Sequence, residues 1–209
     1  MSEEQKQAPQ QKTTGWYRFA RIVGTILTHT VCPVRYHGVE QVAREGAYIL
    51  IANHSSWIDP VILSVAVKKR DVTFLGKKEL TGNKLVKSAL TGMHMIIVDR
   101  HNADMKAMRE CIGALRKGEI LGIFPEGTRH HEGVMEQLES GTALIALRSG
   151  VPMVPALIAS KPRLFHVTHV YFGDPIDYAD LRAEGVSNET GAKLMERIRG
   201  TYRGMIAAK

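Results

Sequence analysis

Short apolar runs rich in β-branched residues recur along this chain, and stretches with helical spacing separate most of them. Runs of this kind are typical of strands that are buried on both faces of a sheet. They fall at residues 47–52, 72–75, 95–98, 120–124, 154–158 and 169–172, and the helical stretches fall at 61–67, 85–90, 104–118, 142–148 and 190–207. The alternation predicts an α/β fold, with a mostly parallel or mixed central sheet and helices on both faces.

The length of the chain, 209 residues, suits one domain built around such a sheet. We expect a disordered polar tail over residues 1–15, a helical segment over 16–35 and the main domain over 36–209. A net charge of +7 favours an anionic partner, such as anionic lipid, an acidic carrier protein or nucleic acid. Nucleic acid ranks last, because no basic run is interleaved with aromatic residues.

The segment over residues 16–34 has the pattern of a helix at a membrane surface. Its apolar residues recur at spacings of three and four, and arginines flank an aromatic start. Only 13 uncharged residues separate Arg21 from Arg35, whereas a membrane-spanning helix needs about twenty. The segment is therefore expected to lie on a membrane surface without crossing it. The alternative is a helix that packs on the core of its own domain.

A histidine and an aspartate follow the first of the central apolar runs, in the sequence Asn53-His54-Ser55-Ser56-Trp57-Ile58-Asp59-Pro60. Asp59 before a proline is typical of a helix N-cap, which would place His54 on the loop between a strand and a helix. A chain folded back at this point would bring the Asp59 carboxylate to one imidazole nitrogen of His54. The other nitrogen could then accept a proton from a substrate hydroxyl. The alternative is an ordinary loop histidine beside a helix cap.

Two arginines, Arg100 and Arg129, lie just beyond apolar runs, where open α/β sheets bind their ligands. Two guanidinium groups at one edge of a sheet suit a phosphate monoester, although each could instead be a solvated surface charge. Gly127 would let the backbone approach the phosphate, and Thr128 would add a hydroxyl donor. Glu126 is a poor partner for phosphate, so it is expected to hold an arginine or a backbone amide in place.

The spacing of the remaining polar residues gives no support to other chemistries. Cys32 and Cys111 stand far apart, and no pair of histidines has the spacing of a zinc site, so no metal is expected. No Gly-x-Ser-x-Gly or phosphate-loop pattern occurs, which argues against a covalent serine mechanism and against nucleotide hydrolysis.

Four ordered blocks of this sequence resemble those of the glycerolipid acyltransferases, particularly the bacterial 1-acyl-glycerol-3-phosphate acyltransferases. The resemblance covers roughly residues 36–180. The blocks are Asn53-His54 with Asp59, residues 92–100 ending at Arg100, Phe124 to Arg129, and residues 151–156, with Lys78-Glu79-Leu80 ahead of the second block.

The resemblance implies an enzyme of glycerol-3-phosphate acyltransferase-like fold that acylates 1-acyl-glycerol-3-phosphate to phosphatidic acid. The donor would be acyl carrier protein or coenzyme A carrying the acyl group, with no cofactor. In this reading His54 is the general base and Asp59 orients it. Other residues would bind the substrate phosphate (Arg129, Thr128, Gly127, Arg100 and Lys78) or support the site (Glu126 and Asn53). The N-terminal segment would hold the enzyme at the cytoplasmic face of the cell membrane.

Two departures from the family pattern leave the acceptor open. His130 stands where many members have serine, and residues 138–141 replace a stretch that carries lysine in many relatives. Glycerol-3-phosphate and other lysolipids therefore remain alternative acceptors. A non-catalytic lipid-binding protein of the same fold is the alternative outside the enzyme class. The intact pair of His54 and Asp59 argues against that alternative, because a binding protein needs no base.

Overall fold

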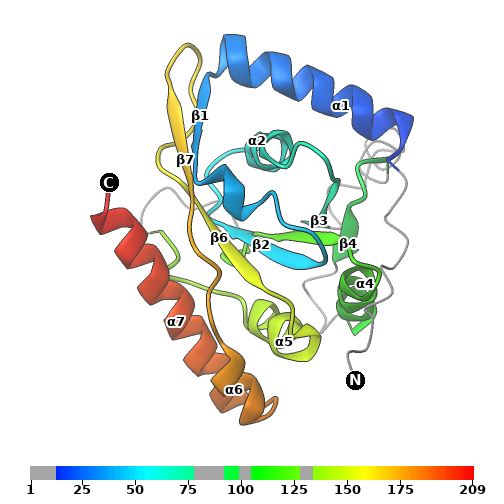
Figure 1. Cartoon of the computed structure of the whole chain (residues 1–209), viewed down its shortest axis with the longest axis vertical. Coiled ribbons are helices and arrows are strands. Elements are labelled where there is room, and N and C mark those ends of the chain that lie inside the picture. The colour runs from blue at the N-terminus through cyan, green and yellow to red at the C-terminus, as the bar shows by residue number, and fades with distance from the viewer. Residues whose placement is uncertain (1–12, 78–91, 99–104, 128–133) are drawn as a thin grey trace.

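A mixed seven-stranded sheet lies at the centre of the molecule (Figure 1). The structure is a computed structural model that describes residues 13–77, 92–98, 105–127 and 134–209. The strand order is β1-β7-β6-β2-β5-β3-β4, and every neighbouring pair is parallel except β6 with β7. The strands are β1 (Val34–His37), β2 (Tyr48–Ala52), β3 (Val72–Lys77), β4 (Ile96–Val98), β5 (Ile120–Ile123), β6 (Met153–Ile158) and β7 (Thr168–Phe172).

Helices cover both faces of this sheet, as the alternation of patterns predicted (Figure 1). Helices α4, α5 and α7 lie on one face, α2 lies on the other, and α1 packs over α2. The α-helices are α1 (Gly15–Ile26), α2 (Asp59–Ala66), α4 (Met105–Arg116), α5 (Ser140–Ser149), α6 (Ala179–Ala183) and α7 (Asn188–Ala207). A π-helical turn (Leu27–Val31) continues α1, and a 3-10 turn (Val39–Gln41) follows β1. The helix expected near residues 85–90 lies outside the described residues.

Strand β2 explains why the core runs along both faces of the sheet. Its five residues are all buried, and successive side chains point to opposite faces. Ile49 and Ile51 pack in the cluster beneath α4, α5 and α7, whereas Leu50 packs beneath α2. Because β5 and β6 pair with β2 in parallel, the carboxyl ends of these three strands meet at one edge of the sheet.

Helix α7 is tied to this sheet by a buried tyrosine. The Tyr202 hydroxyl lies 2.8 Å from the carbonyl oxygen of Ile51 and 3.1 Å from that of Ala156. Burial raises the pKa of Tyr202 well above its usual value, so the hydroxyl remains a protonated donor. The contact joins the ends of β2 and β6, next to the residues that follow them.

Helix α1 has one face toward the protein and one face toward solvent. On the inner face Tyr17 is buried and accepts a hydrogen bond from the Val72 amide at 2.8 Å. Gly24 allows α1 to approach α2 closely, since a Cβ there would lie 2.5 Å from Cγ1 of Val61. The outer face consists of exposed apolar side chains: Trp16, Phe19, Ile22, Val23 and Ile26. In the described parts of the chain, no helix has the length and apolar character needed to cross a bilayer.

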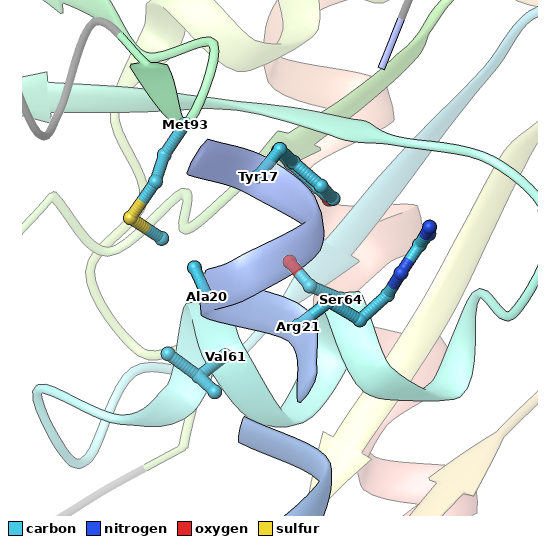
Figure 2. A pocket seen from close by; sticks show the side chains of 6 residues that line it. All are labelled: Tyr17, Ala20, Arg21, Val61, Ser64 and Met93. Atoms are coloured by element: carbon cyan, nitrogen blue, oxygen red, sulfur yellow. The ribbon is translucent and has the colours of Figure 1, made fainter. Parts of the chain in front are cut away.

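A small pocket lies at the contact between α1 and α2 (Figure 2). Tyr17, Ala20 and Arg21 of α1 line it together with Val61 and Ser64 of α2, and Met93 lies beside them. This lining contains neither residue of the histidine–aspartate pair. The pocket is therefore a feature of the helix–helix contact.

The end of the N-terminal helical segment differs from the sequence-based prediction. The helical segment expected over residues 16–35 ends at Val31, because Pro33 has no backbone N–H to continue it. Val34 and Arg35 belong instead to β1, which pairs in parallel with β7. Strand β1 and helix α6 were not predicted.

Candidate active site

His54 and Asp59 form a hydrogen-bonded pair at the carboxyl end of β2. Nδ1 of His54 lies 3.0 Å from Oδ2 of Asp59. The Asp59 side chain is fully buried, whereas 19% of the His54 side chain is exposed. Because a carboxylate can only accept, it fixes Nδ1 as the protonated nitrogen of the neutral imidazole. Nε2 makes no hydrogen bond with any described residue, so it is available as a proton acceptor.

The Asp59 carboxylate points back into the loop, and it does not cap α2 as predicted. Ile58 holds the N-cap position, and Asp59 is the first helical residue, with Pro60 in the first turn as expected. Oδ2 of Asp59 accepts hydrogen bonds from the amides of Ser55 and Ser56, both at 2.7 Å. These amides and the imidazole converge on one buried oxygen. The buried amides of the loop need an acceptor, and the Asp59 carboxylate provides it. The carboxylate therefore points toward the loop and not toward the free amides of the helix end.

Phe124 holds the other side of the imidazole. Its ring stacks on His54 with 4.2 Å between the ring centroids and 23° between the planes. Phe74 stacks on the far side of Phe124, at 5.8 Å. From the sequence, Phe124 was expected to end a buried strand and begin a sequence block, and its contact with His54 was not predicted. The position of Phe124 directly after β5, at the start of the block that ends at Arg129, was the one signal in the sequence. The contact with His54 also depends on β5 being the neighbour of β2 in the sheet.

Glu126 and Asn53 connect the histidine loop to the neighbouring strands. Oε2 of Glu126 accepts a hydrogen bond from the His54 amide at 2.7 Å, and Oε1 accepts one from the Met135 amide at 2.8 Å. The Asn53 side chain pairs with both backbone groups of Ile158, at 2.8 and 3.0 Å. Both side chains are buried. They fix the backbone on each side of the reactive loop.

Gly127 is the last described residue of the block that runs from Phe124 to Arg129. It adopts a φ of 72°, a conformation that L side chains rarely adopt, and its amide donates to the Phe124 carbonyl at 3.0 Å. This turn brings Gly127 to the edge of the sheet where His54 lies. The structure thus assembles five of the nine candidate residues: Asn53, His54, Asp59, Glu126 and Gly127. The other four, Lys78, Arg100, Thr128 and Arg129, lie outside the described residues.

The geometry supports base catalysis by an oriented imidazole. A neutral His54 with a fixed tautomer, a buried carboxylate behind it and an open Nε2 can remove a proton from a hydroxyl. The described ranges contain no group of three or more histidine, cysteine, aspartate or glutamate side chains placed to hold a metal ion. Cys32 and Cys111 are both buried.

Comparisons with known proteins identify the class. The family described as Acyltransferase matches residues 33–159, well over half of the chain. The 1-acyl-sn-glycerol-3-phosphate acyltransferase of Bacillus subtilis (strain 168) is 33% identical over 170 residues, which cover 79% of this chain and 84% of that protein. The chain therefore belongs to the acyltransferase family, and the resemblance found in the sequence is confirmed.

Two further relatives are similar over different shares of their length. The 1-acyl-sn-glycerol-3-phosphate acyltransferase of Streptococcus pneumoniae (strain ATCC BAA-255 / R6) is 30% identical over 154 residues, 70% of this chain and 57% of that protein. The fold is similar to the crystal structure of the 1-acyl-sn-glycerophosphate (LPA) acyltransferase PlsC from Thermotoga maritima. That match has a TM-score of 0.66 and 22% sequence identity, and it covers 92% of this chain and 78% of the other. The predicted fold class is thus confirmed.

Proposed function

We propose that this protein transfers a fatty acyl group from a thioester to the 2-hydroxyl of 1-acyl-sn-glycerol-3-phosphate, and so makes phosphatidic acid for phospholipid synthesis. The observation that carries the proposal is the oriented pair of His54 and Asp59 with an open Nε2. The names of the relatives support the acceptor and the reaction. The donor is the acyl thioester of acyl carrier protein or coenzyme A.

In the proposed reaction, Nε2 of His54 takes the proton of the acceptor hydroxyl while that oxygen attacks the thioester carbonyl. The resulting tetrahedral intermediate collapses, its carbon–sulfur bond breaks, and the imidazolium returns the proton to the departing thiolate. The buried Asp59 carboxylate stabilises the imidazolium between these steps. A thioester is already activated, so holding the two substrates together supplies much of the remaining rate enhancement, with no covalent acyl-enzyme and no cofactor.

Phosphate binding is assigned to the end of the block from Phe124 to Arg129, together with two basic residues that precede it in the sequence. Arg129 would contact phosphate oxygens with its guanidinium fork, assisted by Thr128, the Gly127 backbone, Arg100 and Lys78. Of this set, Gly127 lies in the described part of the site, at the same sheet edge as His54. This placement supports a substrate bound with its phosphate near the end of β5 and its hydroxyl near the imidazole.

Arg129→Ala is expected to weaken acceptor binding far more than donor binding. A charge-assisted hydrogen bond is worth roughly 1.5–3 kcal/mol, so the KM for the acceptor should rise about ten- to more than a hundredfold. Arg129→Lys should restore only part of the affinity, because a point charge cannot reproduce the planar fork. Steady-state kinetics with each substrate varied in turn measure both effects. Equal losses for donor and acceptor would contradict the assignment.

The direct test of the function is product formation by the purified protein in detergent. We expect phosphatidic acid from 1-acyl-sn-glycerol-3-phosphate with either acyl-carrier-protein or coenzyme A thioester. Parallel reactions with glycerol-3-phosphate and with a lyso-aminolipid identify the acceptor. A protein that forms no product with any of these acceptors would be a lipid-binding member of the family.

The exposed face of α1 supports peripheral attachment to a membrane, which we place at the cytoplasmic face of the cell membrane. Five apolar side chains of this helix face solvent, while its opposite side packs on α2. An amphipathic helix of this kind lies in the interface, with its apolar side among the lipids. Arg18 and Arg35 add attraction to anionic headgroups.

Phe19→Ser combined with Ile22→Ser is expected to release the protein from anionic vesicles. The two side chains are 55% and 61% exposed, so their loss should leave the melting temperature unchanged. Full burial of one such side chain is worth about 1.5–3 kcal/mol, so vesicle affinity should fall about tenfold or more for each. Vesicle sedimentation measures the binding, and Val186→Ser, at another exposed apolar residue, is the matched control. Unchanged sedimentation of the double variant would contradict membrane attachment through α1.

A further inference from the structure

The turn at the tip of the loop between β6 and β7 presents two large apolar side chains to solvent. Arg163 and His166 pair across this turn, which places Leu164 and Phe165 at its two central positions. Their exposed fractions are 62% and 78%, and Phe165 is the most exposed of the large hydrophobic residues in the described chain. Neither the Leu164 nor the Phe165 side chain contributes to the core, so packing does not explain why these residues are apolar.

The backbone of Phe165 makes this exposure more notable. Its φ is 58°, in the left-handed region that glycine and asparagine favour at the third position of a turn. An aromatic residue there is sterically costly, and this one gains no burial in exchange. Strained residues of this kind persist where the surrounding structure holds them, and they cluster at functional sites. The side chain is therefore held out from the protein by a fixed turn.

The turn lies beside the end of the helical segment that carries the exposed apolar face. The Phe165 amide donates to the carbonyl of Val31 at 2.7 Å, and the Thr168 amide donates to that of Pro33 at 2.8 Å. Figure 1 shows the β6–β7 loop rising next to this end of α1. The loop leaves β6 directly after Ile158, the residue that pairs with Asn53 beside the catalytic histidine.

The charges around the tip suit an anionic surface. Lys161 and Arg163 precede the two apolar residues, are exposed, and make no ion pair with any described residue. The stretch from residue 160 to residue 167 contains no carboxylate. A basic flank beside an apolar tip is the arrangement that binds headgroups and acyl chains together.

We propose that Leu164 and Phe165 insert into the headgroup layer of an anionic phospholipid membrane, as a second contact beside α1. The inference rests on the proposed function at a membrane surface. A single interfacial helix limits the tilt of the protein only through the width of its apolar face, and a contact away from the helix axis limits this tilt further. The second contact would hold the sheet edge that carries His54 in one fixed orientation toward the lipid.

A fluorescent probe at the tip tests the insertion. Because Cys32 and Cys111 are buried, a cysteine introduced by Phe165→Cys can be labelled selectively with an environment-sensitive dye. Vesicles of equimolar phosphatidylcholine and phosphatidylglycerol should shift the emission to the blue and increase it severalfold. The same dye at Val186→Cys, an exposed site between α6 and α7, should show no change. A dye at residue 165 that stays in water while the protein sediments with vesicles would overturn the proposal.

Phe165→Asn separates insertion from a structural role. Asparagine tolerates a positive φ better than phenylalanine does, so the melting temperature should stay the same or rise. Vesicle affinity should fall about tenfold through loss of the ring, while turnover of a short-chain soluble acceptor should not change. A lower melting temperature with unchanged vesicle affinity would make the residue structural and overturn the proposal. Turnover of the soluble acceptor by the unsubstituted protein tests the proposed function independently of the loop.

Discussion

Replacing His54 with alanine should lower kcat/KM for acyl transfer by about a hundred- to ten-thousandfold, the usual contribution of a general base. Asp59 holds the side chain on one side and Phe124 on the other, and Nε2 has no hydrogen-bond partner among the residues that the structure describes. The backbone of the loop is held separately, by Glu126 at the His54 amide. The loop should therefore keep its path in the variant. The measurement is the initial rate of phosphatidic acid formation, with circular dichroism to confirm the fold.

Two further variants make this test specific. His54→Gln keeps most of the side-chain volume over Phe124 and can still donate to Asp59, but its amide is not a base, so activity should be lost to the same degree. His37→Ala removes an exposed histidine on β1 and should leave the rate unchanged. Near-normal activity in a folded His54→Gln protein would exclude the proposed mechanism.

Asp59→Ala should lower the rate almost as far as His54→Ala, whereas Asp59→Asn should lower it less. Oδ2 of Asp59 accepts all three hydrogen bonds, from His54, Ser55 and Ser56. Alanine removes this acceptor, so the loop and the imidazole lose their orientation, and we expect a loss on the order of 10²–10⁴-fold.

An asparagine oxygen can take the place of Oδ2 and keep both the loop and the tautomer of His54. What it lacks is the negative charge that stabilises the imidazolium. A hydrogen bond to a charged group is worth roughly 1.5–3 kcal/mol against about 0.5–1.5 for a neutral pair, so a loss of about tenfold is expected in kcat. We expect activity to fall from the unsubstituted enzyme to Asp59→Asn and further to Asp59→Ala. The measurement is the rate of each protein on one preparation of vesicles. A loss for asparagine as large as that for alanine would show that its amide group faces the imidazole.

The strands buried on both faces were the most predictable part of the fold. The runs at residues 47–52 and 120–124 differ from β2 and β5 by one residue each, because their apolar composition marks burial directly. Strand β1 was missed because it is short, lies at the edge of the sheet, and directly follows a long stretch with helical spacing, to which its first residues were assigned. Its pairing with β7 depends on the order of strands, which local sequence does not specify.

In the candidate site, too, contacts within one loop were predictable, whereas contacts between strands were not. The contact between His54 and Asp59 was predictable, because their spacing of five residues limits where the loop can place them. The direction of the Asp59 carboxylate was not, because it depends on which amides the folded loop leaves without an acceptor. Glu126 holds a backbone amide, as one of its two predicted roles required, but the sequence did not indicate which amide, nor the contacts of Phe124 and Ile158 with this loop. They arise only because β5 and β6 flank β2 in the sheet.

The sequence of the N-terminal segment fitted two interpretations, a helix at a membrane surface and a helix packed on its own domain. The structure shows why the spacing of apolar residues could not separate them. The spacing of apolar residues along α1 fits a core-packed helix and an interfacial helix equally well. Tyr17 and Gly24 face α2, whereas Phe19 and Ile22 face solvent. The position of α2 beneath α1 was the missing information, since it determines which side of the helix is covered.

The central position of β2 has a consequence for the order in which this protein becomes active as it is synthesised. Asn53 and His54 donate hydrogen bonds to partners 105 and 72 residues away, and Ile51 of β2 accepts one from Tyr202, 151 residues further along the chain. Contacts at such separations form slowly and only after the intervening chain is available. The helical segment that includes α1 leaves the ribosome long before Glu126, Ile158 and Tyr202. The loop that carries His54 therefore completes its long-range hydrogen bonds only after the segment with the exposed apolar face has left the ribosome.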